Sequence, residues 1–486
     1  MSLDRGDLGA EVYETHTGLV ALVGDRAYKV KKPVRTDFLD FSTRDKRESA
    51  CRRELKLNRR LAPAAYLGLG SFQPPTGDPE PVIVMRRYPD AERLAALVRA
   101  GDDVQGWLVT IAGILAGFHR TADRGPMIDR EATAEVLAAR WRQNLTELRR
   151  HTGTVLDEPS LAEIERLAER YLAGRGPLYA DRIAAGRVVD GHGDLLTQDI
   201  FCTADGPVML DCLEFDDQLR YVDGVDDASF LAMDLEFLGR PDLGALFLDE
   251  YCRRADDTAP VSLRHFCIAY RATVRAKTDC VRAGQGRTDS APEAQHHLSI
   301  ALAHLRMGSV RLVMVGGGPG TGKTTVARGL AERLDAEVIS TDDVRRELIR
   351  AGEVQGRAGE LGAGLYAPEN VSAVYGEVLN RARAWLGAGH SVVLDGTWRD
   401  AGHRRHAHAV AAETHSSIVE LRCALPVSEA QRRIATRGAT TSDATPELAA
   451  ELARWEADWP GAHPVDTAAP LPDTVAAAHR VCLDAL

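Results

Sequence analysis

The stretch VRLVMVGGGPGTGKTTVARGL, residues 310 to 330, joins an apolar segment, a glycine-rich loop and an amphipathic segment in that order. Within it, Gly317-x4-Gly322-Lys323-Thr324 has the spacing of a Walker A phosphate-binding loop. Glycines let consecutive backbone N–H groups turn toward a phosphate, and the following helix adds the positive end of its dipole. The stretch therefore predicts a strand, a nucleotide-binding loop and a helix. A glycine-rich turn without a ligand is the alternative.

Two side chains of this loop have specific expected roles. We expect Lys323 to bridge the β- and γ-phosphates of ATP or GTP, and the Thr324 hydroxyl to ligate Mg²⁺. The other loop residues expected to contact the nucleotide are Gly317, Gly318, Gly320, Thr321, Gly322 and Thr325.

Predicted strands alternate with predicted helices from residue 310 to the end of the chain. The later strands are AEVIST at 336–341, SVVLDGTW at 391–398 and SIVELRCAL at 417–425. Such alternation predicts a three-layer α/β domain with a parallel sheet over residues 310–486.

Acidic side chains follow two of these predicted strands. Asp395 ends one strand and is a candidate Walker B carboxylate that faces the metal through water, with a helix cap as the alternative. Asp342 and Arg345 follow another strand, at the carboxyl edge where ligands of parallel sheets bind. We expect them to bind and deprotonate an acceptor hydroxyl. Ordinary capping of the next helix is the alternative reading of Asp342.

Two arginines near the C-terminus stand four positions apart on one predicted helical face, Arg433 and Arg437. Guanidinium groups match phosphate oxygens, so we expect Arg433 to bind the nucleotide and Arg437 to act at the transferring phosphate. A solvated helix face is the alternative. The domain resembles the small P-loop kinases of the gluconate kinase and polynucleotide kinase type. In those kinases an sDxxR segment after the second strand lies near the acceptor, and a lid arginine covers the donor.

A second stretch, VVDGHGDLLTQDIF at residues 188–201, reads as a strand that runs into a catalytic loop. A phosphotransferase of the protein-kinase kind needs a base, a metal ligand a few residues on, and a second metal carboxylate after a short hairpin. Asp194, Asp199 and Asp211 supply these groups in that order. We therefore expect Asp194 to be the base and the other two to be Mg²⁺ ligands.

This region resembles the aminoglycoside phosphotransferase family, whose loop reads His-Gly-Asp-x-x-x-x-Asn followed by Ile-Asp-x-Glu or similar. Four residues match that pattern, namely His192, Gly193, Asp194 and Asp211. Asp199 stands where the family has Asn. An Asp side chain offers an oxygen at the same reach, so we expect a divergent but active kinase. Its extra negative charge is expected to slow transfer or to change metal occupancy.

The resemblance also implies roles for residues of the small N-terminal lobe. Lys29, in RAYKVKKP, is expected to reach the α- and β-phosphates, because the family has an apolar-Lys-apolar strand there, and Lys31 is the alternative on the same strand face. Glu54 is the expected helical partner of that lysine, with Glu48 as a rival. The backbone from Met85 to Arg87 is expected to contact adenine at the hinge between the lobes.

Together these motifs predict an α+β, bilobal, protein-kinase-like phosphotransferase domain at 1–285, with a small lobe to about residue 88 and a large lobe from about 89. A linker and connecting helix at 286–309 would lead to the α/β P-loop nucleoside-triphosphatase domain at 310–486. The whole resembles bacterial two-domain proteins described as aminoglycoside phosphotransferase and ATP-binding fusions. That resemblance implies two nucleotide sites but identifies no substrate.

Composition excludes several other classes of protein. The chain has 486 residues, 44% of them apolar and 27% charged, with a net charge of −11. An acidic chain predicts no extended nucleic-acid surface, and no apolar run reaches the ~20 residues of a membrane span. The acidic N-terminus is unlike a secretion signal, and eight Cys without a Cys-x-x-Cys pair fit neither a zinc ribbon nor a disulfide framework. We therefore expect a cytoplasmic protein.

The leading hypothesis from the sequence is an ATP- and Mg²⁺-dependent kinase. Its acceptor would be a hydroxyl of a small molecule such as an amino sugar, an aminoglycoside or a related polyol. Two other hypotheses stay open: a nucleotide-gated regulatory protein with P-loop ATPase activity, and a kinase of protein or RNA ends.

Overall fold

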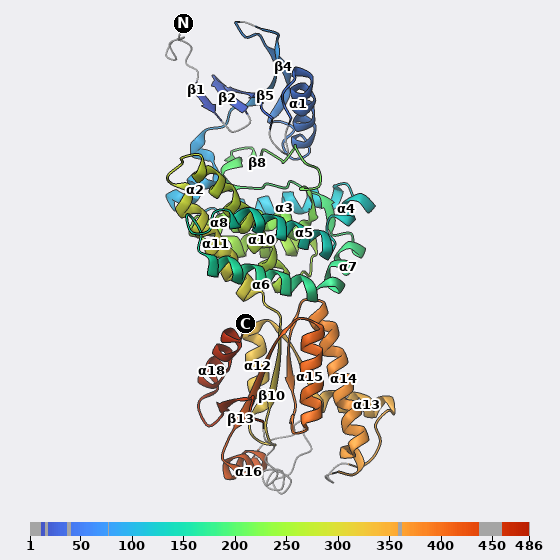
Figure 1. Ribbon diagram of the computed structural model, residues 1–486. Coiled ribbons are helices and arrows are strands. Elements are labelled where there is room, and N and C mark those ends of the chain that lie inside the picture. The colour runs from blue at the N-terminus through green and yellow to red at the C-terminus, as the bar shows by residue number, and fades with distance from the viewer. Residues whose placement is uncertain are drawn as a thin grey trace. The chain divides into compact units, whose positions relative to one another are not determined.

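The computed structural model describes residues 11–14, 18–35, 40–75, 77–357, 362–436 and 459–485 (Figure 1). Contacts divide the chain into two compact units whose segments interleave. The first unit comprises 1–157, 181–259 and 267–301, and the second comprises 158–180, 260–266 and 302–486. The domain boundaries expected from the sequence stay predictions.

The first unit contains a five-stranded antiparallel sheet in the order β1-β2-β3-β5-β4. The strands are β1 (Glu11–Glu14), β2 (Gly18–Val23), β3 (Arg26–Lys31), β4 (Tyr66–Phe72) and β5 (Glu80–Arg86). Helix α1 (Arg44–Asn58) packs against β4 and β5, and Thr43 caps its N-terminus by accepting from the Lys46 N–H. The buried face of α1 carries Glu54, a charged residue of a kind that is rarely buried without a partner.

The rest of the first unit is mainly helical. Its helices are α2 (Leu94–Ala100), α3 (Gln105–Thr121), α4 (Pro126–Arg130), α5 (Ala134–Arg149), α8 (Gly224–Phe237) and α9 (Pro241–Ala255), with a 3-10 turn η1 (Asp90–Glu92). Helix α9 packs on α3 and α8. Three further helices run across the division between the units: α7 (Gly176–Ala184), α10 (Val261–Gly284) and α11 (Ser290–Met307).

Two short antiparallel pairs carry the predicted catalytic loop of this unit. Strand β6 (Val188–Asp190) pairs with β9 (Tyr221–Asp223), and β7 (Ile200–Thr203) pairs with β8 (Gly206–Met209). The loop after β6 runs through the 3-10 turn η2 (Thr197–Asp199) into β7. Both ends of the loop are therefore anchored by strands.

The second unit contains a five-stranded sheet with every neighbouring pair parallel, in the order β11-β12-β10-β13-β14. The strands are β10 (Arg311–Gly316), β11 (Ala336–Ser340), β12 (Ser391–Asp395), β13 (Ser417–Ala424) and β14 (His463–Asp466). Besides α6 (Glu158–Gly174), the unit holds α12 (Lys323–Leu334), α13 (Thr341–Ala351), η3 (Gly364–Tyr366), α14 (Pro368–Gly387), α15 (Ala401–Glu413), α16 (Val427–Thr436) and α18 (Leu471–Asp484).

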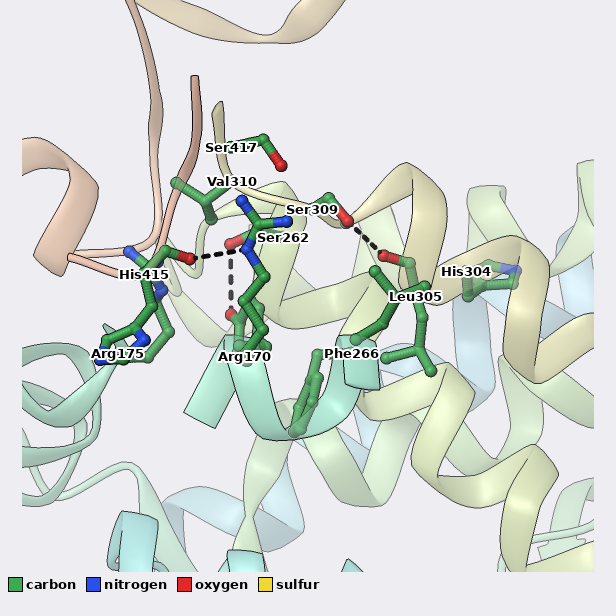
Figure 2. Close-up of a pocket in the computed structure, with 13 residues that line it drawn as sticks. Arg170, Arg175, Ser262, Phe266, His304, Leu305, Ser309, Val310, His415 and Ser417 are labelled. Carbon is green, nitrogen blue, oxygen red and sulfur yellow. Dashed lines mark hydrogen bonds between the residues drawn. The ribbon is translucent and has the colours of Figure 1, made fainter. Parts of the chain in front are cut away.

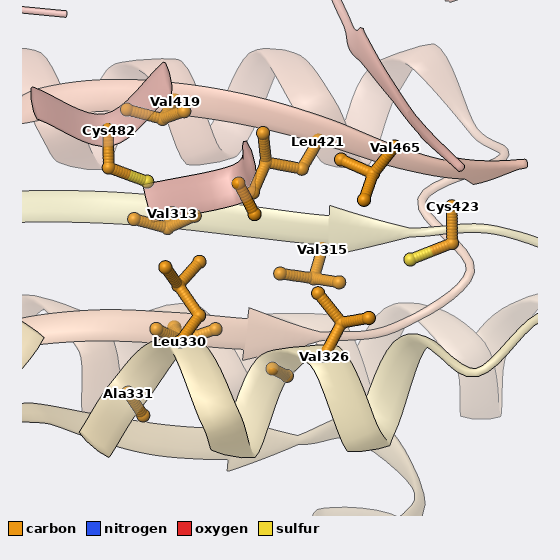
Figure 3. Close-up of a cluster of buried hydrophobic side chains, with 13 residues drawn as sticks. Val313, Val315, Val326, Leu330, Ala331, Val419, Leu421, Cys423, Val465 and Cys482 are labelled. Carbon is orange, nitrogen blue, oxygen red and sulfur yellow. The ribbon is translucent and has the colours of Figure 1, made fainter. Parts of the chain in front are cut away.

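Helices cover both faces of this sheet, with α12 and α18 packed together on one side and α14 and α15 on the other (Figure 1). Val313 and Val315 of β10 lie fully buried against Val326 and Leu330 of α12 (Figure 3). All five strands point the same way, so their carboxyl ends share one edge. The predicted fold class is confirmed as far as an α+β N-terminal part followed by an α/β part with a parallel sheet.

Two expectations for the whole chain concern membrane-spanning helices and disulfides. Within the described ranges, no helix is long and apolar enough to cross a membrane. Each of the eight cysteines is buried and free of a disulfide.

Candidate active sites

A buried carboxylate holds the predicted catalytic loop of the first unit in shape. Asp227, which is fully buried, accepts hydrogen bonds from the backbone N–H groups of His192 (2.7 Å) and Gly193 (2.8 Å). Its Oδ2 also lies 2.9 Å from Nε2 of His119. Burial alone raises the pKa of Asp227, but the hydrogen bond and charge of His119 outweigh it, so the pKa falls below its usual range. An ionised carboxylate therefore holds the backbone of this loop in place.

Three further carboxylates come together at this loop. Asp194 follows Gly193, Asp199 ends η2, and Asp211 follows β8 with a left-handed φ of +63°. Burial raises the pKa of Asp194 to about 6. Burial and then the charges of Asp211 and Asp194 raise the pKa of Asp199 well above its usual value. The structure therefore concentrates carboxylates here, which are the side chains that Mg²⁺ prefers. Among the described residues, however, no three His, Cys, Asp or Glu side chains are arranged to hold a metal ion.

A chain of ion pairs connects these carboxylates to the small lobe. Nζ of Lys29 lies 2.6 Å from Asp211 Oδ1 and 2.8 Å from Oε1 of Glu54, whose side chain is fully buried. Nζ of Lys31 lies 2.6 Å from the other oxygen of Glu54 and also contacts Glu214. Burial opposes the charge of Lys29, but Asp211 and Glu54 raise its pKa well above the usual value. Glu54 therefore holds two lysines.

The rival helical carboxylate lies elsewhere. Glu48 pairs with Arg44 (2.9 Å) and Arg52 (2.6 Å) along the outer face of α1. Of the two candidates, Glu54 is therefore the one that the structure places against the lysines.

The expected hinge lies within and just after β5. Met85 is paired with Ala27 on one side and Tyr66 on the other. The N–H of Arg86 donates to the Ala65 carbonyl, and the N–H of Arg87 donates to that of Asp25, both at 2.9 Å. These two amides are engaged within the lobe. The adenine contact from Met85 to Arg87 stays a prediction, and it would have to use carbonyl groups.

The glycine loop of the second unit has the shape that phosphate binding requires. Gly317, Gly320 and Gly322 have φ values of +145°, +77° and +85°, which side chains rarely adopt. A Cβ at Gly320 would lie 2.6 Å from the Ala430 carbonyl, so the loop has no room for one. Thr321 Oγ1 donates to the Gly318 carbonyl at 2.8 Å, which closes the loop.

The predicted residues of the following helix lie at its first turn. Helix α12 begins at Lys323, with Gly322 as its N-cap, so its free N–H groups point toward the loop. Thr325 is exposed on the helix surface.

A candidate metal-binding pair lies beside this loop. Thr324 Oγ1 donates to Oδ2 of Asp395 at 2.7 Å. Oδ1 of Asp395 is buried and has no hydrogen-bond partner among the described residues. Burial raises the pKa of this carboxyl. An orphaned buried carboxylate oxygen next to a hydroxyl fits a hydrated Mg²⁺. The cap of the next helix is Asp400, so capping does not account for Asp395.

The predicted acceptor residues form an ion pair at the carboxyl end of β11. Arg345 Nη1 lies 2.7 Å from Asp342 Oδ1, and the guanidinium carbon lies 4.9 Å from the centre of the Tyr366 ring. Nε of Arg345 is buried and has no partner among the described residues. Ser340 caps α13 by accepting from the Asp342 N–H. The Asp342 carboxylate is therefore not used as the helix cap.

The two predicted arginines at the C-terminal end differ in what the structure describes. Arg433 donates to Glu429 (3.3 Å) and to the Thr467 carbonyl (3.0 Å). A Cβ at Gly322 would lie 3.6 Å from its Nη1, so the guanidinium borders the glycine loop. Arg437 lies outside the described residues.

Each unit therefore brings together several of the side chains that the sequence predicted for its site. The family described as AAA domain matches residues 312–458. An uncharacterized protein of Mycobacterium tuberculosis (strain ATCC 25618 / H37Rv) is 52% identical over 477 residues, which is 98% of this chain and 96% of that protein. An uncharacterized protein of Mycobacterium bovis matches to the same extent. The chain belongs to the same family as these mycobacterial proteins.

Other similarities cover one part of the chain. Shikimate kinase of Thermobifida fusca (strain YX) is 35% identical over 171 residues, or 30% of this chain and 94% of that protein. A gluconokinase from Sinorhizobium meliloti 1021 aligns with 37% of this chain and 95% of its own at 18% identity and a TM-score of 0.29. Aminoglycoside 2'-phosphotransferase-IIIa aligns with 62% of this chain and 94% of its own at 15% identity and a TM-score of 0.38.

Proposed function

We propose that the chain is an ATP- or GTP-dependent, Mg²⁺-dependent small-molecule kinase that transfers a γ-phosphoryl group to a hydroxyl at the first unit. One observation carries the proposal: Lys29 bridges the buried Glu54 and Asp211, and the Asp211 charge acts on both Asp194 and Asp199. A lysine held by a helical glutamate beside clustered carboxylates is what phosphoryl transfer to a hydroxyl needs.

In this proposal the residues of the first unit have separate roles in phosphoryl transfer. Lys29 binds the α- and β-phosphates, and Asp199 with Asp211 holds Mg²⁺, which when bound neutralises charge on the phosphate oxygens. Asp194, with a pKa of about 6, is ionised at neutral pH. Its carboxylate accepts the proton of the acceptor hydroxyl while that oxygen bonds to the γ-phosphorus. The bond from the γ-phosphorus to the bridging oxygen breaks, and the nucleoside diphosphate leaves.

The acidic residues that follow Asp211 affect which charge an acceptor at the first unit can carry. Most of them are engaged by a partner within the unit: Asp217 pairs with Arg53 and Arg220, Asp223 with Arg182 and Asp226 with Arg271, and Asp227 is hydrogen-bonded to His119. Because these carboxylates already have partners, they do not provide an unpaired negative surface for a polycationic acceptor. We therefore place a polyol or a singly charged amino sugar ahead of an aminoglycoside within the proposed class of acceptors.

The second unit is proposed to hold a second nucleotide. Lys323 and Thr324 would contact the phosphates and the metal, with Asp395 as the second-sphere carboxylate. The carboxyl edge of the sheet beyond them would offer the largely buried Asp342–Arg345 pair to a further acceptor. The similarity of this region to a protein named shikimate kinase supports a small hydroxylated molecule there.

Nucleotide turnover with and without a panel of polyols, amino sugars and aminoglycosides tests this proposal. The assay compares the wild type with Asp194→Ala and Lys323→Ala. Matched controls are Asp205→Ala, in the exposed turn between β7 and β8, and Arg328→Ala, on the exposed face of α12. Acceptor-stimulated turnover that disappears in Asp194→Ala and persists in Lys323→Ala supports it. If no acceptor stimulates turnover and only Lys323→Ala abolishes it, the proposal is wrong and the first unit is regulatory.

A further inference from the structure

A small cavity of about 20 Å³ lies in the second unit, lined in part by Ser309 and Val310 just before β10 (Figure 2). Arg170 on α6 and Arg175 directly after it line one side, and Ser417, the first residue of β13, lines another. Tyr171 and Phe266 stack beside it with ring centres 4.2 Å apart. Aromatic rings and two arginines thus line a cavity that stays partly open to solvent.

Arg175 is the most unusual of the lining residues. It is fully buried, and only its Nη2 is bonded, to the Thr414 carbonyl at 2.7 Å and to Ser416 Oγ at 3.3 Å. Its Nε and Nη1 have no partner among the described residues. Burial lowers the pKa of Arg175 to about 10, which still leaves the group charged at neutral pH. The end of α6 offers a partial negative charge of only about half a unit.

Positive charge at the cavity is reinforced by a second arginine. Nε of Arg170 donates to the His415 carbonyl at 3.2 Å, and in Figure 2 its guanidinium extends toward Ser262 and Val310. Neither arginine makes an ion pair with a carboxylate in the described part of the chain. Oγ of Ser417 is also buried without a hydrogen-bond partner there. Two cations and a spare hydroxyl donor therefore line one cavity, with no carboxylate paired to either cation among the described residues.

We propose that this cavity binds one monovalent anion of the size of chloride, held by Arg175 and Ser417, with Arg170 adding positive charge. Burying an unpaired cation is costly, and a bound anion offsets that cost. A cavity that holds a water needs about 10–15 Å³, so a space of about 20 Å³ fits a single small ion better than a phosphate group. A water molecule could accept the free N–H groups, but it could not balance the charge. The inference does not depend on the kinase proposal.

Thermal unfolding of the full-length protein tests the site. Tm is measured in sodium chloride and in sodium gluconate at equal ionic strength and pH 7.5. Because an anion that binds only the folded state stabilises it by mass action, chloride is expected to raise Tm saturably by about 2–5 °C. In Arg175→Met this chloride-specific rise is expected to disappear. The matched control is Arg166→Met, on the exposed face of the same helix, which should keep it.

A second measurement keeps the test independent of how well Arg175→Met folds. Wild-type crystals grown or soaked in sodium bromide are expected to show an anomalous peak within about 3.5 Å of Arg175, a normal contact distance for such an ion. Equal Tm values in the two salts, or a chloride effect that survives in Arg175→Met, would overturn the proposal. So would a cavity with no anomalous peak, because water alone would then fill it.

Discussion

The ammonium of Lys29 lies 2.6 Å from the carboxylate of Asp211, although 182 positions separate the two residues in the sequence. The same ammonium lies 2.8 Å from Glu54 on α1. Lys29 thereby joins a strand and a helix of the small lobe to the segment that follows β8. Any loss of its charge should affect the predicted Mg²⁺ ligand and the predicted phosphate contact together.

Replacing Lys29 by Met is expected to lower acceptor-dependent turnover by about 100-fold or more, because a preorganised charge at the phosphates is lost. Lys31 still pairs with Glu54, so the fold should persist, which circular dichroism would verify. The control is Lys32→Met, whose ammonium pairs with the exposed Glu14. Equal turnover in the Lys29 and Lys32 variants would contradict the assigned role.

The pH dependence of turnover should report Asp194. Its pKa is raised, first by burial, to about 6, and a general base must be ionised. We expect kcat/KM to fall about tenfold per pH unit below that value and to level off above it, measured in buffers of constant ionic strength. A profile without a break near pH 6 would assign the proton to another group.

The same carboxyl should make a measurable contribution to stability. A folded pKa of about 6 against an ordinary 3.8 means that the neutral form favours folding. That stability is fully present below pH 3.8 and is lost as the pH rises through about 6. Asp194→Asn, which stays neutral, is therefore expected to raise Tm at pH 7.5, by less at pH 5, while abolishing turnover. A lower Tm at pH 7.5 would show that Asp194 has a structural role instead.

The predicted role of Asp199 as a Mg²⁺ ligand can be tested by replacing it with Asn, the residue that the aminoglycoside phosphotransferase family has at this position. Asp199→Asn removes one of several clustered negative charges, so Tm in EDTA should rise by a few degrees. Fewer ligand charges should raise the half-saturating Mg²⁺ concentration about three- to tenfold, with turnover at saturating Mg²⁺ largely kept. Mg²⁺ titrations of the wild type, Asp199→Asn and the exposed control Asp205→Asn measure this. An unchanged Mg²⁺ requirement would remove Asp199 from the metal ligands.

How far the sequence predicts these sites depends on whether the signal is local. The glycine loop between β10 and α12 is a contiguous pattern, and the order Asp194, Asp199, Asp211 lies within one loop and hairpin. Such patterns depend on chain geometry over a few residues, so the sequence alone predicts where these residues lie.

Contacts between polar side chains that lie far apart in the sequence cannot be predicted in this way. Lys31 and Glu214 are 183 positions apart, and His119 and Asp227 are 108 apart, so no spacing pattern links them. No local pattern marks Asp227, although it anchors the predicted catalytic loop. Nothing local marked Arg175 either, because an arginine after a helix is ordinarily solvated.

Two adjacent arginines of α16 offer an internal comparison for the second nucleotide site. Arg432 and Arg433 both donate to Glu429, but only Arg433 also reaches the Thr467 carbonyl and borders Gly322. If a guanidinium there binds a phosphate, Arg433→Ala should weaken Mg²⁺–ATP binding about tenfold, the loss of a charge-assisted hydrogen bond.

The measurement is calorimetric titration with a non-hydrolysable ATP analogue in the Lys29→Met background, where the phosphate contact proposed for the first unit is removed, so that the P-loop site dominates the comparison. Arg432→Ala removes the same charge from the same helix on its exposed side, and it should leave the affinity within about twofold, as surface ion pairs contribute little. Because both variants lower the net positive charge equally, a general electrostatic effect would weaken binding in both. A loss confined to Arg433→Ala therefore assigns the effect to contact with the nucleotide.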